Sequence, residues 1–229
     1  MLAEIDVVIW QQHHIYDRRE LAGAAARQRV GIGMETIRTQ LRAGLDYLFL
    51  PFAWLLLACR VTPNQVSLMG ILLNLLTAWL IADGQLLLAG PMYLLAGGLD
   101  LLDGVLARLA KMATRFGAFL DSTADRISEG VVFVAIAYHF ALHGQSIEAA
   151  VAVLALLGSL LVSYTRARAE GLGLQCNVGI ATRAERVVLV ALGLMFGLLP
   201  GAMYLVAALT AFSTTQRIVH TLRQLYPQG

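Results

Sequence analysis

Charged residues are scarce in this sequence: only 14% of its 229 residues are Asp, Glu, Lys or Arg. In soluble domains about 25% of residues are charged, so this low fraction argues against a soluble protein and for a membrane protein. Cysteine is almost absent too. Cys59 and Cys176 belong to no CxxC or Cys/His pattern, so no metal site is indicated there and both read as small apolar residues.

A secretory signal is also lacking at the start of the chain. The first ten residues include Glu4 and Asp6 and have no basic region of the kind that begins a signal peptide. The segment 1–43 then carries six arginines among alanines and glutamines. Such a segment cannot span a bilayer, and we interpret it as a cytoplasmic N-terminal arm.

Segment 44–61 is apolar but too short for a span, which needs about 20 apolar residues. Tyr47 and Trp54 suit the headgroup level of a membrane. We therefore expect an amphipathic juxtamembrane helix that lies in the interface, with a first true span as the alternative. Thr62-Pro63 then marks the start of a helix, because Thr caps well and Pro suits the first turn.

Six apolar segments make up the rest of the chain, residues 62–229. They run over 64–83, 86–110, 117–142, 147–170, 183–199 and 201–222. Alternate connections carry no Lys or Arg, as the positive-inside rule requires, whereas the connections on the other side hold Lys111 and Arg115, then Arg166, Arg168, Arg183 and Arg186. The pattern predicts an all-α integral membrane protein of the cytoplasmic (inner) membrane, with six transmembrane helices and both termini in the cytoplasm.

Acidic residues gather where the second and third apolar segments adjoin: Asp100, Asp103, Asp121 and Asp125. A charge near the bilayer centre costs at least about 2.5–3.5 kcal/mol, so four acids in apolar segments indicate a role that outweighs this cost. At helical spacing each pair lies on one face, and a short turn makes the two helices antiparallel. Four converging carboxylates need counter-charge, and oxygen-only ligands suit Mg²⁺ or Mn²⁺ rather than zinc.

Small residues accompany the acids. Gly104, Ala107 and Gly117 leave room for a flat or phosphate-bearing group beside the carboxylates, and Arg108 offers a fork of donors to phosphate oxygens. Metal and arginine at the cytoplasmic end of a helix pair indicate phosphoryl chemistry on a lipid-linked substrate. The alternative, a set of structural ion pairs, leaves more acids than nearby arginines and does not explain the small residues.

These residues match a known pattern. The sequence Asp100-x2-Asp103-Gly104-x2-Ala107-Arg108-x8-Gly117-x3-Asp121-x3-Asp125 resembles the full signature of the CDP-alcohol phosphotransferases. Eight residue identities at fixed spacing form a specific signal, and the resemblance extends over about 64–222. It implies an enzyme that displaces CMP from a CDP-linked donor, usually CDP-diacylglycerol, with an alcohol acceptor. It also implies a homodimer and a cytoplasmic active site, with no nucleic acid partner.

The resemblance assigns roles as well. Asp100, Asp103, Asp121 and Asp125 would hold Mg²⁺ or Mn²⁺, as two ions, and Asp125 would also act as general base on the acceptor hydroxyl. The CDP-binding residues would be Asp100, Asp103, Gly104, Ala107, Arg108, Gly117 and Asp121. The donor lipid stays open between a diacyl lipid and an archaeal-type ether lipid.

A second basic group bears on the acceptor: Arg166, Arg168, Arg183 and Arg186, at the end of the fourth apolar segment and the start of the fifth. Converging there, they would bind a phosphate, which suggests a small phosphorylated alcohol. The surrounding sequence is similar to the phosphatidylinositol-phosphate synthase branch and its archaeal-lipid relatives, which implies inositol 1-phosphate. Glycerol 3-phosphate, inositol and serine are the alternatives, and a purely topological role for the arginines is another.

Two rival functions were weighed against this one. A membrane prenyltransferase would have two Asp-rich motifs well apart in sequence, whereas here both pairs lie in one helical hairpin. A cation transporter would scatter polar residues over several spans and often break its helices. Here the charge is concentrated at one end of two adjacent segments, so both rivals fit less well.

Overall fold

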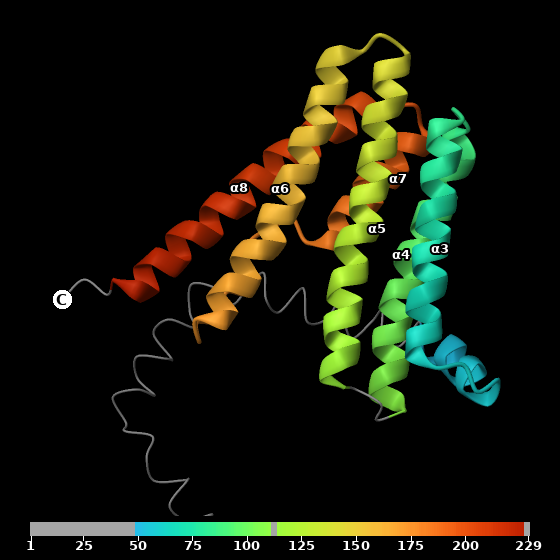
Figure 1. Cartoon of the computed structure of the whole chain (residues 1–229), viewed down its shortest axis with the longest axis vertical. Helices are drawn as coiled ribbons and strands as arrows, with labels where there is room; N and C mark the ends of the chain where they lie inside the picture. Colours follow the sequence, from blue (N-terminus) through green and yellow to red (C-terminus); the bar gives the residue numbers. More distant parts are fainter. Residues whose placement is uncertain (1–48, 111–113, 227–229) are drawn as a thin grey trace, which may run out of the picture. The chain divides into compact units, whose positions relative to one another are not determined.

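The computed structural model describes residues 49–110 and 114–226 (Figure 1). The chain divides into two units, Met1–Pro51 and Phe52–Gly229, and the description below concerns the second. The arm predicted for 1–43 lies outside the described residues, as does the start of the predicted juxtamembrane helix. The rest of that segment contains a short apolar helix, Phe49–Ala58. No strand occurs in the described ranges, so the prediction of an all-α protein is confirmed for them.

Six longer helices follow, in the order the apolar segments predicted. They are α3 (Pro63–Ala82), α4 (Leu86–Leu109), α5 (Arg115–Leu142), α6 (Ser146–Gly171), α7 (Arg183–Met195) and α8 (Leu199–Leu225). Threonine caps start three of them. Thr62 and Thr182 form capping boxes at α3 and α7, and the Thr114 hydroxyl accepts a hydrogen bond from the Gly117 amide at 3.0 Å in α5.

The helices pack as a closed circuit. The main contacts run from α3 to α5, α6, α8, α7, α4 and back to α3. Small residues allow close approach at two of these contacts. A Cβ on Gly158 of α6 would lie 2.2 Å from the Thr210 hydroxyl of α8, and a Cβ on Gly90 of α4 would lie 2.8 Å from the Ala191 carbonyl of α7. Larger residues there would force the helices apart.

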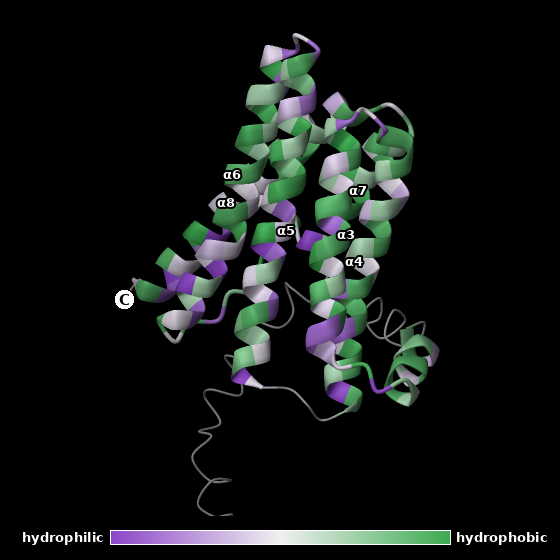
Figure 2. Cartoon of the chain, turned by 45° about the vertical axis from the view of Figure 1, so that its right-hand side comes forward, coloured by the Kyte–Doolittle hydropathy of each residue, from purple (hydrophilic) through white to green (hydrophobic). Residues whose placement is uncertain are grey.

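Apolar side chains occupy both the inside and the outside of this circuit. The core is built from Tyr93, Phe133, Ile136, Phe140 and Met203, among others. Many large apolar side chains, including Leu72, Trp79, Leu87 and Leu154, are instead exposed on the outer faces. Figure 2 shows the resulting hydrophobic colouring along most of the helices, with hydrophilic stretches toward one end. A lipid environment accounts for such an exterior, whereas water would not.

Three helices, α3, α4 and α6, are long and apolar enough to cross a membrane. Helix α5 is longer than any of them but carries four charged residues between its start and its middle: Asp121, Asp125, Arg126 and Glu129. Helix α7 differs most from the prediction. The apolar segment 183–199 ends as a helix at Met195, so its 13 residues measure about 20 Å, short of the roughly 30 Å hydrocarbon core.

Candidate functional site

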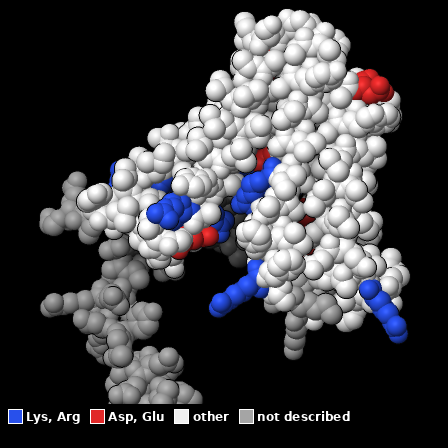
Figure 3. Space-filling model, in the orientation of Figure 1, with Lys and Arg blue, Asp and Glu red and all other residues white. Residues whose placement is uncertain are grey.

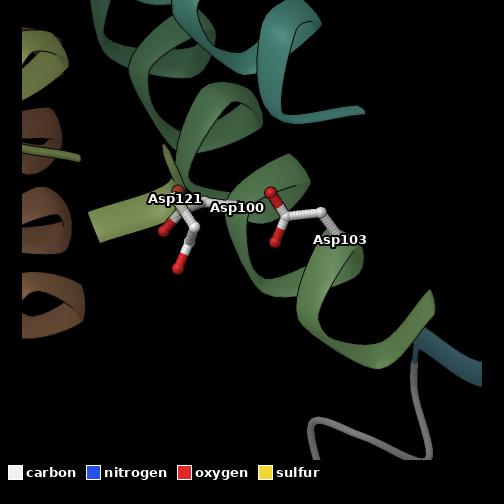
Figure 4. A group of neighbouring side chains, drawn as sticks. All are labelled: Asp100, Asp103 and Asp121. Carbon is white, nitrogen blue, oxygen red and sulfur yellow. The ribbon is translucent and has the colours of Figure 1, made fainter. Parts of the chain in front are cut away.

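Three carboxylates meet between α4 and α5, the two helices that pack on either side of α3. Asp100 lies about two and a half turns before the end of α4 and Asp103 about one and a half turns before it, and both lie on one face of the helix. Asp121 reaches the same place from α5, and one carboxylate oxygen of each residue lies within 4.8 Å of the other two. Figure 4 shows the three side chains facing a common space. The structure therefore brings together three of the four predicted metal ligands directly.

Asp125, the fourth, is linked to this group through an arginine. It lies one turn beyond Asp121 on α5, and its Oδ1 accepts a hydrogen bond from Nη1 of Arg183 at the start of α7. The same nitrogen donates to Oδ2 of Asp100. Arg183 thus bridges a carboxylate of α4 and one of α5. Arg126, on the same helix as Asp125, lies 3.7 Å from its Oδ2 and is more exposed.

The sequence analysis missed one hydroxyl at this site, that of Ser67. Ser67 in the first turns of α3 donates a hydrogen bond of 2.6 Å to Oδ2 of Asp103, whose side chain is buried. A buried carboxylate needs such a partner, and the bond fixes which way the carboxylate points. The two residues are 36 positions apart, so no local spacing indicates the contact.

A second ion pair lies deeper between α5 and α7. Arg186 donates from Nε and Nη2 to the two oxygens of Glu129, at 2.6 and 2.8 Å, and from Nη1 to the Ala181 carbonyl at 2.7 Å. Both side chains are almost fully buried, with 2% and 3% exposed. The paired geometry is what a desolvated guanidinium requires.

This arrangement differs from the prediction for Arg186. That residue was expected to help bind an acceptor phosphate, but each of its guanidinium nitrogens already donates to a protein acceptor and the side chain is closed to solvent. Burial beside Glu129 is the physical reason. The one available sequence signal was that Glu129 continues the i, i+4 face of Asp121 and Asp125.

The other three predicted arginines occupy different surroundings. Arg183 is in the aspartate group, Arg166 pairs along α6 with Glu170 at 2.8 Å, and Arg168 is exposed at the end of α6. Figure 3 shows blue and red atoms adjoining one another in a recess among white ones, with other blue groups on the surface around it. The four arginines therefore differ in their partners and in their exposure to solvent.

Of the small residues predicted near the nucleotide, Gly104 leaves space beside its helix, whereas a side chain on Gly117 would crowd the Thr114 cap of α5. A Cβ placed on Gly104 would meet only the Nη1 atom of Arg108, at 3.6 Å. A Cβ on Gly117 would lie 3.2 Å from the Thr114 hydroxyl and 3.9 Å from the Asn64 side-chain oxygen. Ala107 is half-buried and Arg108 exposed. Asn64, at the start of α3, thus lies beside the same surface as Gly117.

Helix α8 holds in place the loop that leads into α7. The Ser213 hydroxyl accepts hydrogen bonds from the backbone amides of Ile180 and Ala181, at 3.1 and 3.0 Å. Arg217 donates from Nε to the Val178 carbonyl at 2.9 Å. These contacts fix the backbone just before Arg183, so they also fix the point from which the Arg183 side chain extends into the site.

The donor set of the aspartate group fits a divalent cation. Its ligands would all be carboxylate oxygens from two consecutive helices, which is the chemistry that Mg²⁺ and Mn²⁺ favour. Ser67 supplies an outer-shell hydrogen bond to one ligand, as is usual at metal sites. The site therefore has the composition to hold metal against a phosphate group.

Comparison with known proteins identifies the same chemistry. Residues 60–216, more than half of the chain, match the family model described as CDP-alcohol phosphatidyltransferase. An archaetidylinositol phosphate synthase of Methanothermobacter thermautotrophicus is 37% identical over 168 residues, which cover 71% of this chain and 84% of that protein.

Solved structures of the Mycobacterium tuberculosis phosphatidylinositol phosphate synthase are similar in fold. One, with CDP-DAG bound, has a TM-score of 0.70 and 31% identity, and the match covers 77% of this chain and 94% of that one. Another, in complex with manganese and citrate, has a TM-score of 0.69 and 32% identity, covering 75% of this chain and 87% of that one. The predicted family is confirmed.

Proposed function

The chain belongs to the CDP-alcohol phosphatidyltransferase family, and from this premise we propose that it makes a phosphatidylinositol phosphate in the membrane. The donor would be CDP-diacylglycerol or an ether-lipid analogue, the acceptor inositol 1-phosphate, and the released product CMP. The observation that carries the proposal is the convergence of Asp100, Asp103 and Asp121 within 4.8 Å, at the residues of the family signature.

The reaction is a substitution at phosphorus. The acceptor hydroxyl attacks the phosphorus that bears the lipid, the bond from that phosphorus to the CMP oxygen breaks, and the hydroxyl proton is transferred to Asp125. Asp100, Asp103 and Asp121, with Asp125, would hold Mg²⁺ or Mn²⁺, as two ions, which supply charge neutralisation for the diphosphate and the leaving phosphate. Ser67 orients Asp103 for this task.

Two groups of residues would position the substrates. The open surface around Gly104, Ala107, Arg108 and Gly117 would accept the CDP group, since it offers space beside the carboxylates. Arg166, Arg168 and Arg183 would bind the acceptor phosphate, and their positive charge favours a phosphorylated acceptor over inositol or serine. Arg186 would act as a positioning residue, because Glu129 occupies it.

We also propose how the chain lies in the membrane. Helices α3 to α8 would lie across it, with the short α7 covering only part of its thickness, and the end that carries the aspartates and arginines would face the cytoplasm with both termini, in keeping with the positive-inside rule. Residues 62–229 would form the catalytic membrane domain as a homodimer, preceded by the arm 1–43 and the interfacial segment 44–61. The exposed apolar side chains of the outer helix faces support this placement.

The test is CMP release by the purified protein in detergent. CDP-diacylglycerol is offered with Mg²⁺ or Mn²⁺ and one of four acceptors: inositol 1-phosphate, glycerol 3-phosphate, inositol or serine. We expect release that depends on inositol 1-phosphate and stops with EDTA. Release with another acceptor would replace the acceptor and keep the chemistry. Absence of metal-dependent release with every acceptor, and with an ether-lipid donor, would overturn the proposal.

A further inference from the structure

Arg183 occupies an unusual position for a residue expected to bind substrate. A single guanidinium nitrogen, Nη1, contacts both Asp100 and Asp125, two of the four residues proposed to hold metal. Its side chain is 18% exposed, and those of Asp100 and Asp125 are 28% and 20% exposed. The pair is therefore neither sealed in the core nor freely solvated.

Hydrogen bonds hold the backbone around Arg183 in place, whichever partner its side chain contacts. Thr182 and Glu185 form a capping box around it, Ser213 holds the amides of Ile180 and Ala181, and Arg186 is fixed to Glu129 one turn along. Only the long side chain has freedom to move. Arg183 thus has a fixed backbone and a long side chain whose guanidinium can reach more than one partner.

A divalent cation and this guanidinium compete for the negative charge of the same carboxylates. Asp100 and Asp125 each keep one oxygen that Nη1 does not contact, and each carboxylate has about four lone-pair sites, so the competition comes from charge and not from a shortage of lone pairs. The two cations would also repel each other at that distance. Metal bound by all four aspartates therefore weakens the contact of Arg183 with Asp100 and Asp125.

On the basis of the proposed function, we infer that Arg183 is an internal counter-cation of the aspartate group, which metal displaces and which then binds the acceptor phosphate. Arg183 neutralises Asp100 and Asp125 until an ion takes its place. Displacement turns its donors toward the phosphate side of the site and leaves the Asp125 lone pairs that the ion does not use open to the acceptor hydroxyl. Metal and phosphorylated acceptor are thus coupled, each favouring the binding of the other.

The inference is tested by Mn²⁺ binding without any substrate, measured from the loss of the free Mn²⁺ signal in electron paramagnetic resonance. A competitor that holds the carboxylates about 90% of the time weakens the apparent affinity about tenfold. We therefore expect Arg183→Gln to bind Mn²⁺ on the order of ten times more tightly than the wild type. Arg183→Lys, which keeps the charge but not the fork of donors, should lie between them.

Arg126→Gln is the matched control. It removes one positive charge from the vicinity of Asp125, but Arg126 is more exposed and lies 3.7 Å from one carboxylate only. We expect its Mn²⁺ affinity to change by less than about threefold. A tightening equal to that of Arg183→Gln would show a general effect of charge and overturn the inference.

A second titration tests the coupling. Inositol 1-phosphate should tighten Mn²⁺ binding to the wild type, and this effect should be lost in Arg183→Gln. Complex formation between Mn²⁺ and the phosphate in solution is the same for both proteins and cancels in the comparison. Equal Mn²⁺ affinities and equal coupling in the two proteins would overturn the inference but leave the proposed function in place. A wild type that binds no Mn²⁺ would overturn both.

Discussion

Two arginines on α7, one turn apart, pair with two acids on α5, also one turn apart, yet the two pairs differ in kind. Arg186 and Glu129 are almost fully buried and share two hydrogen bonds. Arg183 and Asp125 are partly exposed, and the Nη1 atom of Arg183 contacts both Asp125 and Asp100. The buried pair is closed to solvent and Arg186 also donates to the Ala181 carbonyl, so this pair is suited to join the helices. The open pair can exchange partners, so it is suited to chemistry.

The largest effect is expected where the open pair is altered at its carboxylate. Asp125→Asn keeps the shape of the side chain but removes its ability to accept the proton. We expect turnover, measured as CMP release, to fall by about 10² to 10⁴, the usual contribution of a general base. Binding of the CDP-linked donor should change far less. Unchanged turnover would remove Asp125 from the role of base.

The buried pair should respond through stability instead. Glu129→Gln leaves the Arg186 guanidinium without its counter-charge, and breaking a buried pair by removing one partner costs about 3–5 kcal/mol. Thermal unfolding in detergent should show the loss. The matched control is the double variant Glu129→Leu, Arg186→Met, which removes both charges and should regain most of the stability. A Glu129→Gln protein as stable as the wild type would contradict the structural role of the pair.

Ser67→Ala is expected to weaken metal binding without direct loss of a ligand. The hydroxyl orients Asp103 at 2.6 Å, and removal of an outer-shell partner usually costs about 10- to 100-fold in metal affinity or activity. Mn²⁺ titration gives the measurement. Ser122→Ala, on the exposed side of α5, serves as a control for a general effect of removing a hydroxyl. Equal affinities of Ser67→Ala and wild type would show that Asp103 does not need this contact.

The smallest effect is expected at the surface. Arg168 is exposed at the end of α6, so Arg168→Gln should leave folding nearly unchanged. The KM for inositol 1-phosphate should rise by about tenfold, the loss of one charge-assisted hydrogen bond, with little change in the KM for CDP-diacylglycerol. If both KM values move together, Arg168 does not distinguish acceptor from donor.

Much of the helical framework was predictable because a membrane helix is encoded by a long, continuous run of apolar residues. The predicted segments 64–83, 86–110 and 147–170 match α3, α4 and α6 to within one residue at each end. The fifth segment was less well predicted. Residues 196–198 are as apolar as the helix before them, but Gly197 adopts a left-handed conformation with φ of 69°, and hydrophobicity alone does not report the end of a helix.

The aspartate group was predictable for the same reason: its members lie at i, i+3 and i+4 spacings on two consecutive helices, so local geometry brings them to one place. The arginines were not, because all four had the same sequence signal, a position beside a connection predicted to lie in the cytoplasm. Their different surroundings depend on α5 and α8, which supply Glu129 and the contacts of Ser213 and Arg217 with the loop before α7.

The sequence by itself thus determined the helices, the family and the four acids, since each follows from residue types at short, fixed spacing. Only the tertiary structure decided which arginine is buried and which faces the aspartates, and that Ser67 supports Asp103. The physical reason is that a charged side chain takes its role from the partners and the solvent around it. Those partners come from helices far apart in the chain, where sequence spacing carries no information about contact.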